Sequence, residues 1–558
     1  MQSDYRLKGT YEMEKLKPKL FSVMKGYTRE QFIKDVTAGI IVAIIALPLS
    51  IALALASGVT PEKGIYTAIT AGFVISLLGG SRVQIAGPTA AFATIVAGIV
   101  ARNGIEGLVL ATILAGVILI LMGLLRFGSL IKFIPYTITT GFTSGIAVTI
   151  LVGQIKDFLG LQIVTQEPLI ETVDKLSAIL RFLETTNWQA VIVGAVCLGI
   201  LIAWPFLPGV CKKIPPSLVA VLAGIGMVSG LGMKVSTIGD LYEISNELPP
   251  LSLPAFDFHM VQNVLPDAFT IAILAAIESL LSCVVADGMI GSRHRSNMEL
   301  IAQGAGNITS ALFGGIPATG AIARTAANVK NGGRTPVSGM VHALTLLLIL
   351  VVLMPYAALI PMPAIAAILF MVAYNMSEWR KFVYLCKTSP KSDILVLTVT
   401  FVLTVLFDLV VAIEVGIVLA AVLFMKRMSD VTQVEGWKYP EGKEEEESLL
   451  PVPRGTFVYE VGGPLFFGAA DKLLTISLPK NQKCLILRMR SVNAIDATAM
   501  HHLEQLQEEC AGKNIRLIFS HVNQQPMNVM KKAGFVEKVG ERNFCGHIEE
   551  ALKLAEEA

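Results

Sequence analysis

Glu278 is the residue of this sequence with the clearest chemical potential, because it lies in the middle of the long apolar run 265–287. An ionisable side chain at the centre of a membrane-spanning helix costs roughly 2.5–3.5 kcal/mol on insertion scales, so such residues usually face a cavity and serve transport. A carboxyl group in an apolar pocket can hold a proton through desolvation. The structural alternative is a buried glutamic acid that is bonded to Arg324 or to the backbone.

The segment 313–336, FGGIPATGAIARTAANVKNGGRTP, is too apolar for an ordinary surface loop and too interrupted for an ordinary span. Paired glycines and Pro317 prevent a helix at its start, whereas 318–330 can form a half-helix of roughly 18–20 Å. Extended backbone followed by a half-helix is tolerated at membrane depth only where it lines a cavity enclosed by protein. We therefore expect the unpaired N–H groups near Ala318 to Ala321 to face an anion near the midplane.

Residues 79–101, GGSRVQIAGPTAAFATIVAGIVA, repeat this pattern with paired glycines, an extended stretch and a short helix over 88–101. This helix is expected to run toward the outside and the helix 318–330 toward the inside, so their N-termini should face each other. Two short Gly/Pro-interrupted segments in corresponding positions point to a transporter binding site. The residues at the two tips that are expected to contact the anion are Thr89, Ala90, Gly320, Ala321 and Ile322.

The composition is that of a membrane protein. The chain is 53% hydrophobic and 16% charged, with a mean hydropathy of +0.64, whereas ordinary soluble proteins carry about 25% charged residues. About fourteen spans are predicted between residues 36 and 427. The loops assigned to the inside are basic, as the positive-inside rule requires. We therefore expect a multi-pass protein of the cell inner membrane with both termini in the cytoplasm.

Four regions are expected along the chain: a cytoplasmic segment 1–35, a transport domain 36–427, a linker 428–455 and a domain 456–558. The linker is polar and contains the acidic run KEEEE at 443–447, which is typical of a solvated stretch. The last region alternates strand and helix patterns, which predicts a soluble α/β domain. Its strands are expected within 456–467, 483–490 and 515–522, and its helices at 497–511, 523–534 and 545–556.

These residues resemble the SulP/SLC26 family of anion transporters. The resemblance lies in Gly87-Pro88-Thr89, in AAIESLL at 275–281, in PATGAIARTAANV at 317–329 and in a C-terminal STAS-like domain. It implies an α-helical polytopic fold of about fourteen spans in a 7+7 inverted repeat, with core and gate domains and a cytosolic α/β STAS domain. It also implies elevator-like alternating access and often a homodimer. Within the family, stretches such as QIKDFLGLQ and VAYNMSEW are most similar to bacterial C4-dicarboxylate transporters.

The resemblance also implies roles for individual residues. Related transporters place a carboxylate at the position of Glu278, sometimes in a sodium site with a hydroxyl one turn on. Glu278 and Ser282 are therefore expected to hold the coupling ion, a proton or Na⁺. The position of Thr89 lies in the substrate site of bicarbonate-transporting relatives, although Thr89 could also be a plain helix cap. Phe92 is expected to line the site through its family position.

Arg324 resembles a basic residue near the anion site in the animal members of the family. A guanidinium group can hold a carboxylate with two parallel bonds, so Arg324 would be the natural partner of a second carboxylate on the substrate. It could instead snorkel toward the cytoplasm or pair with Glu278.

Asp496-Ala497-Thr498 follows a strand of the C-terminal region and opens a helix. STAS-like domains of the anti-sigma antagonist type carry a phosphorylatable hydroxyl at the matching place, so Thr498 is a candidate regulatory site. The alternative is that Asp496 simply caps the helix.

The leading functional hypothesis is uptake of a C4-dicarboxylate, such as succinate, fumarate or aspartate, with a proton or Na⁺. Bicarbonate or sulfate transport is the alternative within the family. Two alternatives belong to other functional classes: a channel-like conductor, and a membrane-anchored regulator whose STAS-like domain recruits a cytosolic protein. The sequence has no GxxxxGK[ST] loop for ATP and no metal-ligand spacing of histidines. We expect no enzymatic activity, cofactor, metal or nucleic-acid partner. The expected partners are a small anion, the bilayer, a second copy of the chain and a cytosolic protein that binds the STAS-like domain.

Overall fold

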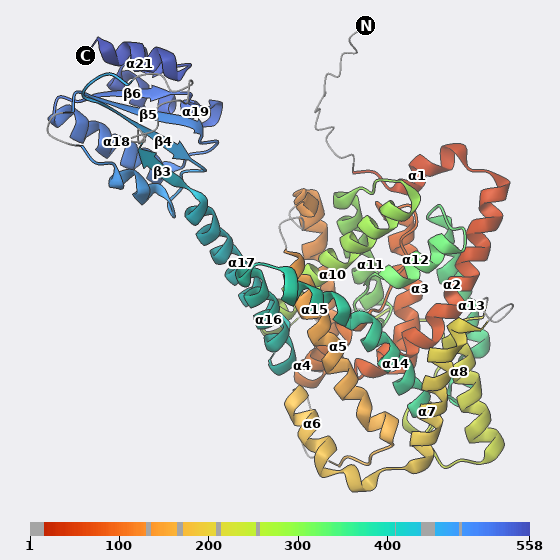
Figure 1. Ribbon diagram of the computed structural model, residues 1–558. Helices are drawn as coiled ribbons and strands as arrows, with labels where there is room; N and C mark the ends of the chain where they lie inside the picture. The colour runs from red at the N-terminus through yellow and green to blue at the C-terminus, as the bar shows by residue number, and fades with distance from the viewer. Residues whose placement is uncertain are drawn as a thin grey trace. The chain divides into compact units, whose positions relative to one another are not determined.

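The computed structural model describes residues 16–129, 135–164, 171–207, 214–252, 257–407, 409–436, 452–478 and 482–557. The chain divides into two compact units, Met1–Ile417 and Val418–Ala558. The helices and short strands up to the end of the last long helix, shown in Figure 1, are α1 (Lys19–Val23), η1 (Met24–Gly26), α2 (Arg29–Ala56), α3 (Pro61–Leu78), β1 (Ala86–Gly87), α4 (Ala90–Leu124), α5 (Tyr136–Leu159), α6 (Thr172–Arg181), α7 (Trp188–Ala203), α8 (Pro216–Ile225), α9 (Ile238–Leu241), α10 (Phe258–Ile290), α11 (Ser296–Leu312), β2 (Thr319–Gly320), α12 (Ile322–Lys330), α13 (Val337–Ala357), α14 (Met362–Ser377), α15 (Trp379–Thr388), α16 (Lys391–Leu406) and α17 (Leu409–Val431).

The helices of the first unit pack in two groups. In one group α11 packs on α3 and α4, α13 on α2 and α3, and α12 on α10 and α2. Figure 1 shows α11 and α12 next to α3. In the other, α5 packs on α14 and α16, and α7 on α14 and α8. The first group contains every element that was predicted to carry the binding site.

A two-stranded crossing lies at the centre of the first group. Strand β1 pairs with β2 in antiparallel register, Ala86 opposite Gly320 and Gly87 opposite Thr319. Because the strands are antiparallel, the helices that follow them, α4 and α12, leave the crossing in opposite directions. Both strands, together with Ala318, are fully buried. The predicted meeting of two broken spans of opposite direction is therefore present.

Side chains satisfy the backbone polar groups of the two broken segments. Glu299 of α11 accepts the N–H groups of Gly80 and Ser81 at 2.9 and 3.1 Å. Asn307 of the same helix accepts the Ala318 N–H at 2.8 Å and donates to the Ala318 carbonyl at 2.9 Å. In a membrane interior, non-helical backbone persists only where the protein supplies such partners. Helix α11 is therefore the scaffold of both interruptions.

The second half-helix is shorter than predicted. Helix α12 begins at Ile322 and not at Ala318, because Thr319 and Gly320 are extended in the crossing. The expectation of free N–H groups at Ala318 and Ala321 was wrong: the first donates to Asn307 and the second to the Ile85 carbonyl at 2.9 Å. The predicted boundary between the spans 88–101 and 105–125 is the single residue Gly104, whose φ of 69° breaks α4.

Six helices among the described residues are long and apolar enough to cross a membrane. They are Arg29–Ala56, Ala90–Leu124, Tyr136–Leu159, Trp188–Phe206, Phe258–Ile290 and Val337–Ala357. Several other helices of the bundle, α12 at nine residues among them, fall below that length. A count of uninterrupted spanning helices is therefore lower than the number of predicted spans.

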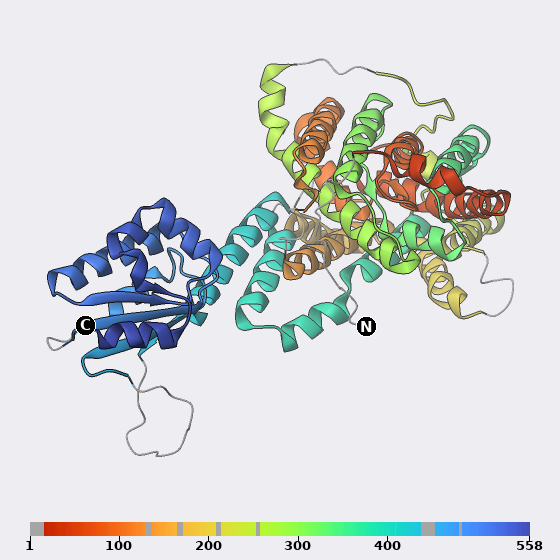
Figure 2. The same ribbon diagram turned by 90° about the horizontal axis from the view of Figure 1, so that it is seen from above.

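The second unit contains a five-stranded sheet in the order β3-β4-β5-β6-β7, with β3 antiparallel to β4 and the other neighbours parallel. Its side chains alternate between two layers: Leu485 and Leu487 pack with α18, whereas Cys484 and Ile486 pack with α21. Helices thus cover both faces, as Figure 2 shows. The elements are β3 (Gln433–Gly436), β4 (Thr456–Gly462), η7 (Ala470–Thr475), β5 (Cys484–Ser491), α18 (Ala497–Gly512), β6 (Arg516–Ser520), α19 (Gln524–Lys532), α20 (Phe535–Val539), η8 (Glu541–Asn543), β7 (Phe544–Cys545) and α21 (Ile548–Glu556).

The three predicted strands and three predicted helices of this domain are confirmed as β4, β5, β6, α18, α19 and α21. Part of the range expected to be linker is structured, because α17 continues to Val431 and residues 433–436 form the edge strand β3. Short polar strands such as QVEG have no apolar alternation to reveal them. The acidic run 443–447 lies outside the described residues.

We predict that Gly320→Ala lowers the thermal stability of the detergent-purified protein. A Cβ at this position would lie 1.9 Å from Gln84 Nε2, and Gln84 would have to leave its bonds to Glu299 and Ser279. Overpacking of this kind costs about 1–3 kcal/mol. Gly153→Ala is the control, because its Cβ would meet nothing within 4 Å and the same exchange in a helix is neutral or stabilising. Equal unfolding temperatures for the two variants would contradict the tight crossing.

Candidate functional site

Glu278 and Thr89 join α10 to the tip of α4. The Thr89 hydroxyl donates a hydrogen bond to Glu278 Oε2 at 3.0 Å. Thr89 has the backbone position of a helix cap, with φ −124° and ψ 158°, but its side chain makes no capping bond. The alternative that Thr89 is a plain cap is therefore not what the structure shows, and its hydroxyl is directed to the candidate coupling carboxylate.

Glu278 retains more bonding capacity than a structural carboxylate would. It is partly buried, and the Thr89 hydroxyl is its one hydrogen-bond partner among the described residues. Glu299, by contrast, is fully buried and accepts four bonds, from Gly80, Ser81, Gln84 and Gln303. An ionised carboxylate can accept about four. Glu299 is therefore fully used in holding the backbone, whereas Glu278 is available to a proton or a cation.

Arg324 is the third residue of α12, and its side chain is 2% exposed. Nη2 donates to the Pro88 carbonyl at 3.1 Å, and no partner for Nε or Nη1 is found in the described part of the chain. Burial at this level excludes snorkelling, and no ion pair with Glu278 is present among the described side chains. Buried donors without partners are costly. An anion that accepts from Arg324 would remove that cost.

The first turns of helices α4 and α12 lie on either side of the Arg324 guanidinium group. Thr89 and Ala90 begin α4, next to the Pro88 carbonyl that Arg324 contacts, and Ile322 begins α12. The first N–H groups of a helix have no intrahelical partner, and the helix dipole adds a positive partial charge there. Phe92 is completely buried in the first turn of α4. Gly320 and Ala321 lead into α12 through the crossing and so position its tip, and their contact with the anion stays a prediction.

Ser282 does not join Glu278 in the way the resemblance implied. It is completely buried, and its hydroxyl bonds to the Thr325 hydroxyl of α12 at 3.3 Å. Thr325 in turn accepts the Ile85 N–H at 3.0 Å, just before β1. The two predicted coupling residues therefore connect α10 to different tips, Glu278 to α4 and Ser282 to α12. The expectation that Glu278 and Ser282 together hold the coupling ion stays a prediction.

Two residues with a buried polar character were missed or left aside by sequence reasoning. Glu299 in SNMELIAQGAG carries the same signal as Glu278, an acid within a span, but its pattern of partners is visible only in three dimensions. His342 of α13 is completely buried, and neither ring nitrogen has a partner among the described residues. The His342 ring lies close to α3, because a Cβ added at Gly72 would be 4.0 Å from His342 Nδ1. This is the side of α3 that also packs on Ala86.

In the C-terminal domain Asp496 caps α18. One carboxylate oxygen accepts the Ala499 N–H at 2.9 Å and the other accepts the Phe467 N–H at 2.8 Å. Thr498 lies partly exposed in the first turn of the same helix. The capping alternative is thus present in the structure, and phosphorylation of Thr498 stays a prediction. Three or more His, Cys, Asp or Glu side chains placed to hold a metal do not occur among the described residues.

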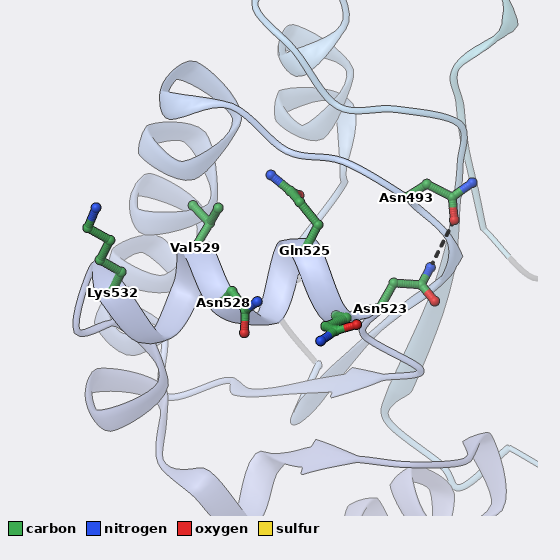
Figure 3. Close-up of a pocket in the computed structure, with 7 residues that line it drawn as sticks. Asn493, Asn523, Gln525, Asn528, Val529 and Lys532 are labelled. Atoms are coloured by element: carbon green, nitrogen blue, oxygen red, sulfur yellow. Dashed lines mark hydrogen bonds between the residues drawn. The ribbon is translucent and has the colours of Figure 1, made fainter. Parts of the chain in front are cut away.

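A shallow pocket of about 580 Å³ lies beside α19 (Figure 3). Amide side chains line most of it, and two of them are used in the fold. Asn523 donates to the carbonyls of Arg490 and Val492 at 2.9 and 2.8 Å. Gln525 accepts the Ile495 N–H and donates to the Ile495 carbonyl. These bonds hold the loop between β5 and α18, so the pocket is first of all a structural feature.

Comparison with known proteins agrees with this architecture. The profile of the Sulfate permease family matches residues 32–400, and that of the STAS domain matches residues 448–551. The chain is 41% identical over 533 residues to the "Putative sulfate transporter YvdB" of Bacillus subtilis, covering 94% of this chain and 98% of that protein. It is 32% identical over 540 residues to the bicarbonate transporter BicA of Picosynechococcus sp., covering 93% and 94%.

Solved structures show the same fold. The transmembrane domain of a cyanobacterial bicarbonate transporter BicA matches 71% of this chain and 98% of that chain, with a TM-score of 0.62 and 30% identity. Murine Slc26a9 in the inward-facing state covers 100% of this chain and 97% of its own at a TM-score of 0.88. Its 18% identity makes it evidence for the fold alone. The predicted helical membrane transporter with a C-terminal STAS domain is confirmed.

We predict that Thr89 and Glu278 act as a coupled pair in anion binding. Thr89→Val and Glu278→Gln, alone and together, should be compared by the anion-dependent rise in unfolding temperature of the purified protein. Because one bond joins the two side chains, the effect of the double variant should differ from the sum of the two single effects, with a coupling energy of about 0.5–3 kcal/mol. Thr89→Ser keeps the hydroxyl and serves as the control. Strict additivity would contradict a functional bond.

We predict that Asp496→Ala lowers the stability of the C-terminal domain by about 0.5–2 kcal/mol, because α18 loses its cap. Thr498→Ala is the matched control and should leave the free energy of unfolding in urea unchanged within about 0.5 kcal/mol, since surface substitutions rarely exceed that range. A reversed order of the two variants would show that Thr498, and not Asp496, is the structural residue of this turn.

Proposed function

This chain belongs to the sulfate permease (SulP/SLC26) family of anion transporters, and from this premise we propose that it carries a small oxyanion across the membrane by alternating access. The proposed substrate class is sulfate or bicarbonate, and the proposed coupling ion is a proton or Na⁺ at Glu278. The relatives described above are named as transporters and not as enzymes.

The observation that carries this proposal is the partly unpaired guanidinium of Arg324. It is buried at the meeting point of two helix N-termini, with two donor nitrogens that have no partner in the described part of the chain. Helix N-termini favour anions because their N–H groups and dipoles are oriented toward the ligand. A bound oxyanion would complete the hydrogen bonding of this group. A protein that used its spans only as an anchor would need neither the broken helices nor a desolvated arginine.

The choice of substrate class rests on the relatives. The proteins compared above are named for sulfate and for bicarbonate, and none of them is named for a C4-dicarboxylate. The finer resemblance to C4-dicarboxylate transporters is therefore not supported. In the described part of the chain the site offers one arginine, which with the helix tips could also serve a dicarboxylate, so the site itself does not decide between the classes. Succinate remains a useful test compound for this reason.

The different partners of the two acids support the proposed coupling role. Among the described residues Glu278 has a single hydrogen bond and stands beside the α4 tip, whereas Glu299 is saturated. Binding of a proton or Na⁺ at Glu278 would cancel its repulsion of an incoming anion. The anion and the coupling ion would therefore favour each other's binding, which is the thermodynamic basis of symport. A homodimer and a cytosolic partner of the STAS domain remain predictions that stand beside this proposal.

The test is uptake by the purified full-length protein in liposomes. Labelled sulfate, bicarbonate and succinate should be offered separately, with an imposed pH gradient, an imposed Na⁺ gradient, or neither. We expect gradient-stimulated uptake of sulfate or bicarbonate and little uptake of succinate. Glu278→Gln should abolish the stimulation by the gradient. Dominant succinate uptake would overturn the substrate class, and unaltered stimulation in Glu278→Gln would overturn the coupling role.

We predict that Arg324→Gln raises the KM for the anion about 10–100-fold. Hydrogen bonds to charged groups contribute about 1.5–3 kcal/mol, and about 1.4 kcal/mol corresponds to tenfold in affinity. Arg181→Gln, at the exposed end of α6, is the control and should leave the KM unchanged. An Arg324→Gln variant that is folded by size-exclusion chromatography and has the wild-type KM would contradict a substrate contact.

A further inference from the structure

The segment before the first long helix is fixed to two connections of the transport domain, and Asp35 of α2 holds a third. The Lys19 N–H donates to the Gly79 carbonyl at 2.8 Å, and Lys19 Nζ donates to the Arg293 carbonyl at 2.7 Å. Arg295 donates to the Lys17 carbonyl at 2.7 Å and to Ser22 Oγ at 3.0 Å. Residue 79 precedes β1, and residues 293–295 connect α10 to α11. The N-terminal segment therefore lies across the same end of the elements that carry the anion site.

Asp35 fixes the third connection, the turn between α12 and α13. It is completely buried near the start of α2 and accepts the backbone N–H groups of Arg334 and Thr335 at 2.8 and 3.3 Å. It also accepts bonds from the side chains of Thr335, Tyr27 and Gln31 at 2.6, 3.0 and 3.0 Å. The carboxylate of Asp35 is therefore saturated by this turn and its neighbours.

A cavity of about 530 Å³ lies between the N-terminal segment, Arg82 and the turn at 334–335. Lys19, Arg82 and Arg334 line it, together with the hydroxyl or amide groups of Ser22, Tyr27, Thr28, Gln31 and Thr335. No carboxylate is among the residues that line it. Arg82 Nε has no partner among the described residues. The cavity thus combines three cations with polar side chains. The side-chain donors of Tyr27, Gln31 and Thr335 are used by Asp35, so the three cations are its main binding groups.

The positive charges in and around this cavity act on one another. Burial lowers the pKa of Lys19, the nearby Arg295 and Arg82 lower it further, and Asp287 acts in the opposite direction. An anion in the cavity would interact favourably with the two guanidinium groups and the ammonium group at once. Phosphate suits this arrangement because it accepts several charge-assisted hydrogen bonds.

An apolar surface adjoins the cavity on the same segment. Phe21 and Met24 are 55% and 45% exposed and lie three residues apart in consecutive helical turns, so they project on a similar side. Lys25 and Arg29 are exposed next to them. Exposed aromatic and apolar side chains beside basic ones, directly before a spanning helix, are typical of a segment that lies in the membrane interface. The negative potential of an anionic leaflet attracts such a segment.

We propose that this cavity binds the phosphate-bearing headgroup of an anionic phospholipid, while Phe21 and Met24 enter the acyl boundary beside it. The lipid phosphate contacts Lys19, Arg82 and Arg334, and so holds the N-terminal segment against the connections that lead into β1, α11 and α13. Anionic lipid thereby stabilises the site-bearing group of helices. The proposal requires that α2 spans the membrane, but it is independent of the anion that the protein transports.

The experiment measures the unfolding temperature of the purified full-length protein in detergent with added dioleoyl-phosphatidylglycerol or dioleoyl-phosphatidylcholine. We expect phosphatidylglycerol to raise the wild-type value by about 2–5 °C over phosphatidylcholine, as ligand binding to the folded state does. Arg82→Gln and Phe21→Ser should each lose at least half of this difference. Arg82→Lys keeps the charge and should retain most of it.

Matched controls come from the opposite end of the transport domain. Lys234→Gln removes an exposed cation. Phe258→Ser removes an exposed aromatic side chain at the start of α10, and the far end of this helix is about 50 Å away along its axis. Neither should change the lipid effect. Each variant is first checked in phosphatidylcholine for a wild-type elution volume and unfolding temperature. If a variant fails this check, two other measurements test the proposal. They are the lipid effect in the charge-retaining Arg82→Lys variant and the number of phosphatidylglycerol molecules bound to the wild-type protein in native mass spectrometry.

Four results would overturn the proposal. An equal effect of the two lipids on the wild-type protein would show that no anionic headgroup is selected. An undiminished phosphatidylglycerol effect in folded Arg82→Gln, or an equal loss in Lys234→Gln, would place the effect outside this cavity. If millimolar inorganic phosphate alone reproduced the shift, the site would be one for a free anion and not for a lipid.

Discussion

The pairing of two short strands, Ala86–Gly87 with Thr319–Gly320, is the interaction on which the rest of the transport domain depends. Each strand interrupts a span that would otherwise be one helix, and backbone interrupted in a membrane must find partners within the protein. Pairing the two interruptions satisfies part of each and sets the helices α4 and α12 in opposite directions. The positive ends of both helices then lie at the crossing. Arg324 and Glu278 lie next to these ends.

The buried polar side chains around the crossing fall into two classes. Glu299, Gln84 and Asn307 are held by bonds to the interrupted backbone or to one another, and these bonds stabilise it. Among the described residues Arg324 and Glu278 are incompletely bonded, and Thr89 is bonded to Glu278 in place of its own helix. The full bonding of Glu299 is that of a structural residue, whereas the unmet bonding capacity of Arg324 and Glu278, next to two helix tips, is what a ligand site would require. This distinction, more than depth in the membrane, separates Glu278 from Glu299.

The sequence predicted the elements of this site better than its contacts. Gly-Pro interruptions and an acid in an apolar run identify residues 79–101, 313–336 and Glu278, because breakers and buried charges carry a large local cost. The start of α12 could not be predicted, because Thr319 and Gly320 become extended only through pairing with residues more than two hundred positions away. The same holds for Thr89, whose local pattern is that of a cap and whose partner lies on α10. Partners that are distant in sequence leave no trace in a local pattern.

The most direct test of the account is a cryo-electron microscopy map of the protein with sulfate or bicarbonate bound. The account predicts anion density between the first turns of α4 and α12, within hydrogen-bond distance of the Arg324 guanidinium and of helix N–H groups. Density for the anion elsewhere, with Arg324 bonded only to protein, would contradict the central claim. So would a map in which Ala86–Gly87 and Thr319–Gly320 are unpaired.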